Sequence, residues 1–212
     1  MTLDEWNIEC QKHLINEFNK LKLVFNKQTI NYLDIGANVG VLYDLLKLEY
    51  NIDQVVMIEP DPIMFNYLNN KFKDIECTLI NAAITDKDKN KILFQNNCNN
   101  ADNYGLNKVD ETYGSIEVNN ISFDKFLNEN KSFLEIVDYI KMDTENYDWC
   151  LMEVLYNFLN KNNLRPLIGF ENNWINQMDI NQAEKIYNLF IDNLGYKGPK
   201  FHSIDSDILL HL

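Results

Sequence analysis

Residues 31–40 read NYLDIGANVG: a short apolar run ends in Asp34, and Gly36 and Gly40 follow it. The apolar run predicts a strand that is buried on both faces. Glycine permits a sharp turn and lets a ligand approach without a Cβ in its way, and residues 41–50 then read as a helix. In a doubly wound α/β sheet, ligands bind outside the carboxyl ends of the strands, facing the first amides of the next helix. The stretch therefore predicts an α/β fold and the position of a ligand site.

Strands and helices continue to alternate along the chain, after an amphipathic helix at residues 4–25. Further helices are expected at 60–72, 121–130, 147–162 and 181–194, and further strands at 54–59, 77–84, 136–143 and 165–171. Two short strands, 195–201 and 205–212, have no room for a helix between them, so they must run antiparallel. We expect one doubly wound, mostly parallel seven-stranded α/β sheet with an antiparallel C-terminal strand pair. An N-terminal helical segment, 1–28, would precede this single domain, 29–212.

Residues 84–120 break the alternation. A turn and an edge strand are expected at 85–95. The polar, asparagine-rich stretch 96–114 is longer than most loops in compact domains. It is either a lid over a site or a surface loop without a role, and the sequence leaves both open.

Composition excludes several classes of function. The 212 residues carry a formal net charge of −13, and their basic residues are scattered among acids, which argues against nucleic acid as a partner. The four cysteines lie far apart without a CxxC pair, so neither a disulfide framework nor a structural zinc site is expected. The N-terminus does not resemble a secretory signal, and no apolar run approaches the roughly 20 residues of a membrane span. A cytoplasmic protein is expected; its oligomeric state cannot be read.

Glu59 indicates what the glycine turn binds. It ends the second strand, 19 residues after Gly40, where a carboxylate can accept hydrogen bonds from both ribose hydroxyls. A dinucleotide site needs G-x-G-x-x-G, whereas this turn reads G-x-N-x-G and follows Asp34, whose carboxylate would repel a pyrophosphate. That carboxylate suits a cationic amino group, which favours S-adenosylmethionine. An NAD-dependent oxidoreductase is the less favoured alternative.

The motifs together resemble a known family. LDIGANVG, VVMIEPDP, LINAAITD, VDYIKMDTENYDWCLMEVL and PLIGFE occur in the order found in the FkbM family of S-adenosylmethionine-dependent O-methyltransferases, members of the class I superfamily. The similarity runs from about residue 30 to residue 210 and leaves out residues 1–28. It implies methyl transfer to a hydroxyl of a sugar, glycan or secondary metabolite.

The resemblance also implies residue roles. The contacts to the methionine end of the cofactor would be Asp34, Gly36, Ala37, Asn38 and Gly40. Glu59 would bind the ribose, and the residues bordering the adenine would be Pro60, Asp61, Asn81 and Ala82. Asp143 and Glu145 would face the methyl group and the acceptor.

An acceptor hydroxyl must lose its proton during transfer, so a general base within hydrogen-bond reach is expected. The candidates are Asp143, Glu145 and Glu171, which follow the strands at 136–143 and 165–171. Asp143, Glu171 and Asn172 could alternatively hold Mg²⁺, since oxygen ligands suit that ion.

Residues 143–148 depart from the family pattern D-x-E-G-x-E. They read DTENYD, so Asn146 stands for a glycine and Asp148 for a glutamate. Asparagine tolerates a left-handed backbone, and the turn can still form. The shorter Asp148 would alter rate or specificity if it touches substrate, and would change little if it only caps the next helix. The departure leaves open a catalytically inactive module that binds S-adenosylmethionine.

Overall fold

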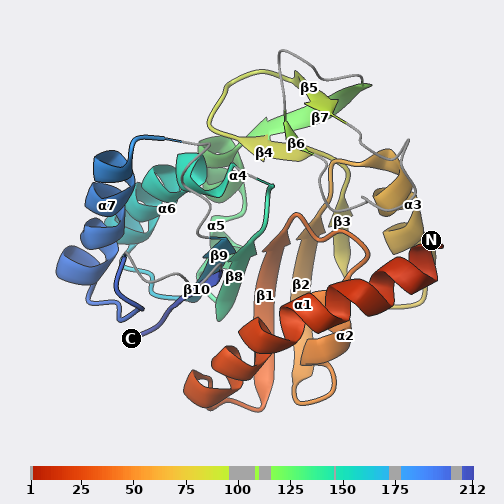
Figure 1. The fold of residues 1–212 in the computed structure, drawn as a ribbon, viewed down its shortest axis with the longest axis horizontal. Helices are drawn as coiled ribbons and strands as arrows, with labels where there is room; N and C mark the ends of the chain where they lie inside the picture. Colours follow the sequence, from red (N-terminus) through yellow and green to blue (C-terminus); the bar gives the residue numbers. More distant parts are fainter. Residues whose placement is uncertain (1, 96–107, 110–115, 146, 172–177, 202–206) are drawn as a thin grey trace.

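A computed structural model describes residues 2–95, 108–109, 116–145, 147–171, 178–201 and 207–212. Within these ranges the main sheet has six strands (Figure 1). Their order is β10 (Asp207–Leu210), β9 (Leu167–Glu171), β8 (Tyr139–Met142), β1 (Thr29–Ile35), β2 (Asn51–Ile58) and β3 (Thr78–Ile80). All neighbours are parallel except β10, which pairs antiparallel with β9. The predicted doubly wound, mostly parallel sheet is confirmed.

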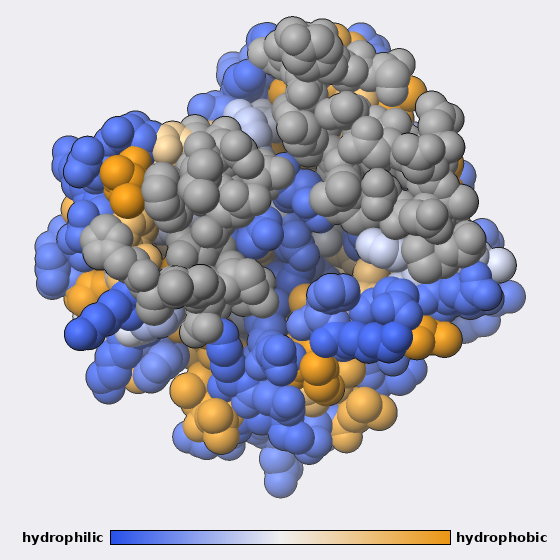
Figure 2. All heavy atoms as spheres, viewed as in Figure 1, coloured by the Kyte–Doolittle hydropathy of each residue, from blue (hydrophilic) through white to orange (hydrophobic). Residues whose placement is uncertain are grey.

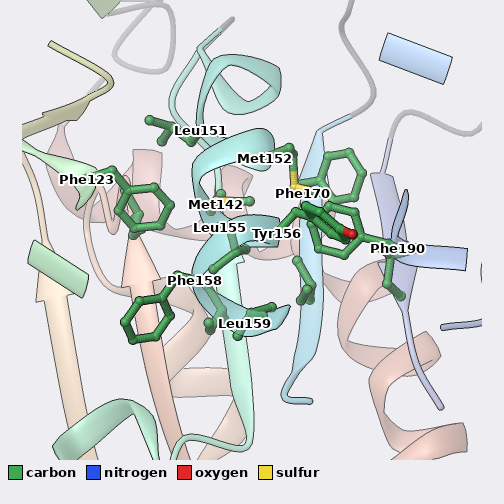
Figure 3. Packing of buried hydrophobic residues seen from close by; sticks show 14 of the residues in the cluster. Phe123, Met142, Leu151, Met152, Leu155, Tyr156, Phe158, Leu159, Phe170 and Phe190 are labelled. Carbon is green, nitrogen blue, oxygen red and sulfur yellow. The ribbon is translucent and has the colours of Figure 1, made fainter. Parts of the chain in front are cut away.

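Helices cover both faces of the sheet (Figure 1). One face is covered by α1 (Leu3–Val24), α2 (Val41–Leu46) and α3 (Pro62–Lys71). The other is covered by α4 (Phe123–Glu129), α5 (Lys131–Leu134), α6 (Asp148–Asn162) and α7 (Ile180–Asn188), which continues into a π-helical turn at Leu189–Asn193. In α6, apolar residues at three-to-four spacing face β8 and β9. Leu155 is one of them, and it lies in one cluster with Met142 and Phe170 (Figure 3). Each such fully buried side chain contributes roughly 1.5–3 kcal/mol to folding.

A second, four-stranded sheet lies over the carboxyl ends of the main sheet (Figure 1, top). Its strand order is β4 (Ala83–Thr85), β7 (Ile116–Ser122), β5 (Lys91–Gln95) and β6 (Lys108–Val109). The expected single strand 77–84 is therefore wrong, because Asn81 and Ala82 separate β3 from β4. The Asn81 side chain donates to the backbone oxygens of Glu59 (2.8 Å) and Pro60 (3.3 Å), which fixes the crossing between the sheets. The rest of the loop expected at 96–114 lies largely outside the described residues.

The prediction of a C-terminal strand pair is correct for one strand and wrong for the other. β10 is present, but residues 195–201 form no strand, and Lys197 makes only an isolated bridge with His211. Gly195 adopts φ +78°, and Pro199 has no N–H to donate to a ladder. For these reasons the main sheet has six described strands instead of the expected seven.

Helix α1 begins with a complete capping box formed by Thr2 and Glu5. Its apolar face is buried on the chain's own sheet through Phe18 and Leu21. No helix in the described part of the chain is both long enough and apolar enough to cross a membrane. Hydrophilic residues dominate the face shown in Figure 2, in keeping with the high net charge.

Candidate functional site

The glycine turn between β1 and α2 contains three residues with left-handed backbone: Gly36 (φ +84°), Asn38 (φ +50°) and Gly40 (φ +73°). The amides of Gly36 and Ala37 both donate to the Ile58 carbonyl, at 2.9 and 3.0 Å, which joins the turn to β2.

Both glycines are needed for packing as well as for their φ angles. A Cβ on Gly36 would overlap the backbone oxygen of Asp143, and one on Gly40 would lie 2.6 Å from the Phe72 ring. The loop after β8 therefore packs against Gly36, and the end of α3 packs against Gly40; Gly36 also lines the cleft described below.

Glu59 directly follows β2 and is 5% exposed. Its Oε2 accepts from the Asn38 amide and its Oε1 from the Asp61 amide, both at 2.8 Å. Burial outweighs these two bonds and raises the pKa of the Glu59 carboxyl to about 8. Each carboxylate oxygen can accept a further hydrogen bond, and Glu59 lines the cleft described next.

A cleft opens at the carboxyl ends of β1, β2 and β8, beneath the second sheet. Its cavity volume is about 60 Å³, and the cleft is partly open to solvent. It is lined by Ile35, Gly36, Asn38, Ile58, Glu59, Pro60, Met64, Ala82, Ala83, Ile84, Phe94, Asp143, Thr144 and Glu145. The structure thus brings together predicted residues that lie up to 109 positions apart in the sequence.

Six predicted site residues do not line this cleft: Asp34, Ala37, Gly40, Asp61, Asn81 and Glu171. Ala37 and Gly40 belong to the turn itself. Asp61 is the N-cap of α3, where its Oδ1 accepts from the amides of Ile63 (2.7 Å) and Met64 (3.4 Å). Asn81 supports the crossing between the sheets.

Asp34 lies in β1, two residues before Gly36, and is 1% exposed. Its Oδ1 is buried and has no hydrogen-bond partner among the residues that the structure describes. Burial raises the pKa of Asp34 to about 6, although the Lys141 ammonium opposes the shift. A buried carboxylate oxygen without a partner is costly, so this atom is suited to a cationic group.

The loop after β8 carries two of the candidate bases. The Asp143 carboxylate forms an ion pair with the buried Lys141 ammonium at 2.9 Å. Glu145 has φ +51°, a conformation that is rare for a non-glycine residue. Its carboxyl faces the cleft, and burial, followed by the charges of Asp143 and Glu171, raises its pKa to about 9. Glu171, the third candidate, ends β9 and does not line the described cleft.

Asp148 is hydrogen-bonded to the loop after β8. Its Oδ1 accepts from the amide and the hydroxyl of Thr144, at 3.0 and 2.9 Å, and its side chain is fully buried outside the cleft. The structure shows neither of the two roles considered for this shorter acid: Tyr147 is the N-cap of α6 without a side-chain cap hydrogen bond, and Asp148 instead holds the loop that precedes the helix. Asn146 lies outside the described residues.

No group of three or more His, Cys, Asp or Glu in the described ranges is arranged to hold a metal ion. Asn172, the third residue of the expected Mg²⁺ site, lies outside those ranges.

Sequence reasoning missed Lys141, Phe94 and Trp6. Lys141 could have been suspected, because a lysine inside an apolar strand marks a buried charge that needs partners. Phe94 reaches the cleft from β5, which the sequence indicated only as an edge strand. The Trp6 indole donates to Asn38 Oδ1 at 3.0 Å, a contact across 32 residues that no local pattern reveals.

Comparisons with known proteins agree on the fold. The sequence matches the family model of the methyltransferase FkbM domain over residues 34–197. The FkbM methyltransferase of Methylobacillus flagellatus has a TM-score of 0.54 at 15% identity; the match covers 90% of this chain and 45% of that chain. The chain therefore spans less than half the length of that protein.

Two other solved structures have lower TM-scores. A precorrin-6y C5,15-methyltransferase of Geobacter metallireducens has a TM-score of 0.46 at 11% identity, covering 90% of this chain and 82% of that one. An O-methyltransferase of Bacillus cereus in complex with SAH has the same TM-score and identity, covering 86% and 74%. Curated protein sequences include no match.

Proposed function

The chain belongs to the FkbM methyltransferase family, and from that premise we propose that it transfers the methyl group of S-adenosylmethionine to a hydroxyl of a sugar, glycan or secondary metabolite. One observation supports this most directly. The glycine turn, Glu59 and Glu145 line the same cleft, at the strand ends where α/β sheets bind ligands.

The residues present fit this cofactor. Glu59 offers a lone pair on each carboxylate oxygen to the two ribose hydroxyls. Asp34, the residue predicted to bind the ammonium of the methionine end, has an unpartnered buried Oδ1 but does not line the cleft, so that contact stays a prediction. Apolar side chains of Ile58, Met64 and Ala82 provide a surface for the adenine ring.

The charge of the cleft also favours a cationic cofactor. Glu59, Asp143 and Glu145 line it, and no lysine or arginine is among its described lining residues. A pyrophosphate would need cationic or amide donors at close range, so the oxidoreductase alternative has no support from this surface. An acid-lined cleft lowers the free energy of a bound sulfonium.

Bound S-adenosylmethionine supplies an activated methyl group and a positive charge. We assign the removal of the acceptor's proton to Glu145, whose raised pKa makes it a stronger base than an ordinary carboxylate. A neighbouring positive charge lowers that pKa and ionises the group for this role. Asp143 forms an ion pair with Lys141, and we assign it to orienting the acceptor hydroxyl.

The first test is calorimetry of the purified protein with S-adenosylmethionine and, separately, with NAD⁺. We expect binding of the first alone, at micromolar concentration. Formation of S-adenosylhomocysteine is then followed with monosaccharides, oligosaccharides and phenolic metabolites as acceptors, with and without Mg²⁺. Binding of NAD⁺ alone would contradict the cofactor. Binding of S-adenosylmethionine without turnover on any hydroxyl acceptor would leave the inactive binding module as the function.

A further inference from the structure

Helix α1 precedes the span that the family model matches, yet it contacts the cofactor turn directly. The Nε1–H group of Trp6 donates a 3.0 Å hydrogen bond to the side-chain oxygen of Asn38. Asn38 also lines the cleft. A segment outside the shared domain thus supports the centre of the glycine turn.

Asn38 is the residue of the turn that most needs support. It has φ +50°, a left-handed conformation that asparagine tolerates better than other side chains but less readily than glycine. Its own amide donates to Glu59 Oε2 at 2.8 Å. Two hydrogen bonds therefore connect Trp6 through Asn38 to Glu59, the carboxylate assigned to the ribose.

Other contacts hold α1 in place independently of Trp6. Near its start, Asp4 accepts a 2.9 Å hydrogen bond from the Tyr67 hydroxyl of α3. Further along, the buried Glu17 accepts a hydrogen bond from the Tyr139 hydroxyl of β8, and Phe18 is buried in the core. The indole is thus presented to Asn38 by a helix that is fixed along its length.

We propose that Trp6 is a positioning residue of the cofactor site. It keeps Asn38 in the left-handed conformation before the cofactor binds, so that binding does not have to order the turn. Ordering a flexible segment on binding lowers affinity, and preorganisation removes that cost. The inference rests on the proposed function and adds to it a residue from outside the shared domain.

The test compares two variants that each remove one hydrogen bond of α1. Trp6→Phe keeps an aromatic ring but has no N–H donor, and Tyr67→Phe removes the bond to Asp4 without touching the turn. Hydrogen exchange of the amides at 36–40 is measured in the free protein, followed by the Kd for S-adenosylmethionine and by kcat. For Trp6→Phe we expect faster exchange, a Kd raised roughly 2- to 10-fold and a nearly unchanged kcat at saturation. Tyr67→Phe should leave all three unchanged.

A double-mutant cycle separates positioning from general docking of α1. Asn38→Gly accepts the same φ and removes the acceptor of the indole bond, so adding Trp6→Phe to it should raise the Kd no further. Equal effects of Trp6→Phe and Tyr67→Phe, or additive effects in the cycle, would overturn the proposal. If Trp6→Phe failed to fold, an unchanged Kd for S-adenosylmethionine in Asn38→Gly would also overturn the proposal. A wild-type protein that does not bind S-adenosylmethionine refutes the proposed function, and exchange in the free protein still decides the role of Trp6.

Discussion

Replacing Glu59 by Gln tests whether burial or hydrogen bonding determines the pKa of the Glu59 carboxyl. Burial raises its pKa from 4.5 to about 8 in the folded protein. Between these pH values the folded state holds a proton that the unfolded chain has released. Rising pH therefore favours unfolding: the stabilisation is complete below pH 4.5 and is lost as the pH rises through 8. The slope is about 1.4 kcal/mol per pH unit, up to about 5 kcal/mol over the window.

Gln resembles the protonated form of Glu59, because each has one good acceptor oxygen for the two backbone amides of Asn38 and Asp61. We therefore expect Glu59→Gln to match the wild type at pH 5 and to exceed its free energy of unfolding at pH 8 by several kcal/mol. The measurement is urea unfolding of the free proteins at pH 5 to 8.5. Other buried carboxyls titrate in both proteins and cancel in the difference.

At pH 8.5, where Glu59 is mostly ionised, the same variant should bind S-adenosylmethionine more weakly. Hydrogen bonds to a charged group contribute about 1.5–3 kcal/mol, so losing the ribose acceptor raises the Kd roughly 10- to 150-fold. A variant that is more stable but binds more weakly would show that the Glu59 carboxyl contributes to binding while it lowers the free energy of unfolding. If the variant were instead less stable than the wild type by about 1–3 kcal/mol at pH 8, with equal pH slopes, the two amides would be keeping Glu59 ionised and our reasoning from burial would be wrong.

Three further substitutions give distinct expectations. Gly36→Ala places a methyl group against the Asp143 carbonyl at φ +84°, so urea unfolding should show a loss of about 2 kcal/mol or more, and an unchanged stability would refute the close approach. Gly169→Ala puts a Cβ 2.5 Å from Glu17 Oε1, and we expect its melting temperature to fall while the Kd for cofactor changes little. Glu145→Gln should lower kcat by roughly 10²- to 10⁴-fold with cofactor affinity retained. In the wild type, ionisation of Glu145 should make kcat rise with pH, and the variant should lose this rise. A rise that persists in the variant would point to another base.

The main sheet was predictable because its signals are local. Buried parallel strands are continuous apolar runs, and Pro62 after Asp61 marks the start of α3, where the structure shows a proline at the first turn and the predicted cap. β7 was missed because Asn119 and Asn120 stand in its middle. Asn120 is 6% exposed and donates to the carbonyls of Lys87 and Lys89, more than 30 residues earlier, so its burial depends on contacts that sequence spacing does not encode.

The residues of the candidate site also fall into two groups: those that the sequence predicts and those that only the structure shows. The turn and Glu59 follow from spacing along the chain, and the family model and the cleft support their grouping. The role of Asp148 depends on which way one carboxylate points, and only the structure shows that it accepts from Thr144. Lys141 lies within a quoted motif, but only the structure shows that it is buried and paired with Asp143. Trp6 contacts a residue of another element across 32 positions, so no motif contained it.

The crossing at Asn81 has a consequence for how two ligands would bind. Its carbonyl accepts from the Asn119 side chain of β7 (3.1 Å), while its own amide group donates to the carbonyl of Glu59, directly after β2 (2.8 Å). One residue therefore connects the sheet above the cleft to the residue assigned to the ribose. If the acceptor displaces the upper sheet, acceptor and cofactor are expected to change each other's dissociation constants by the same factor.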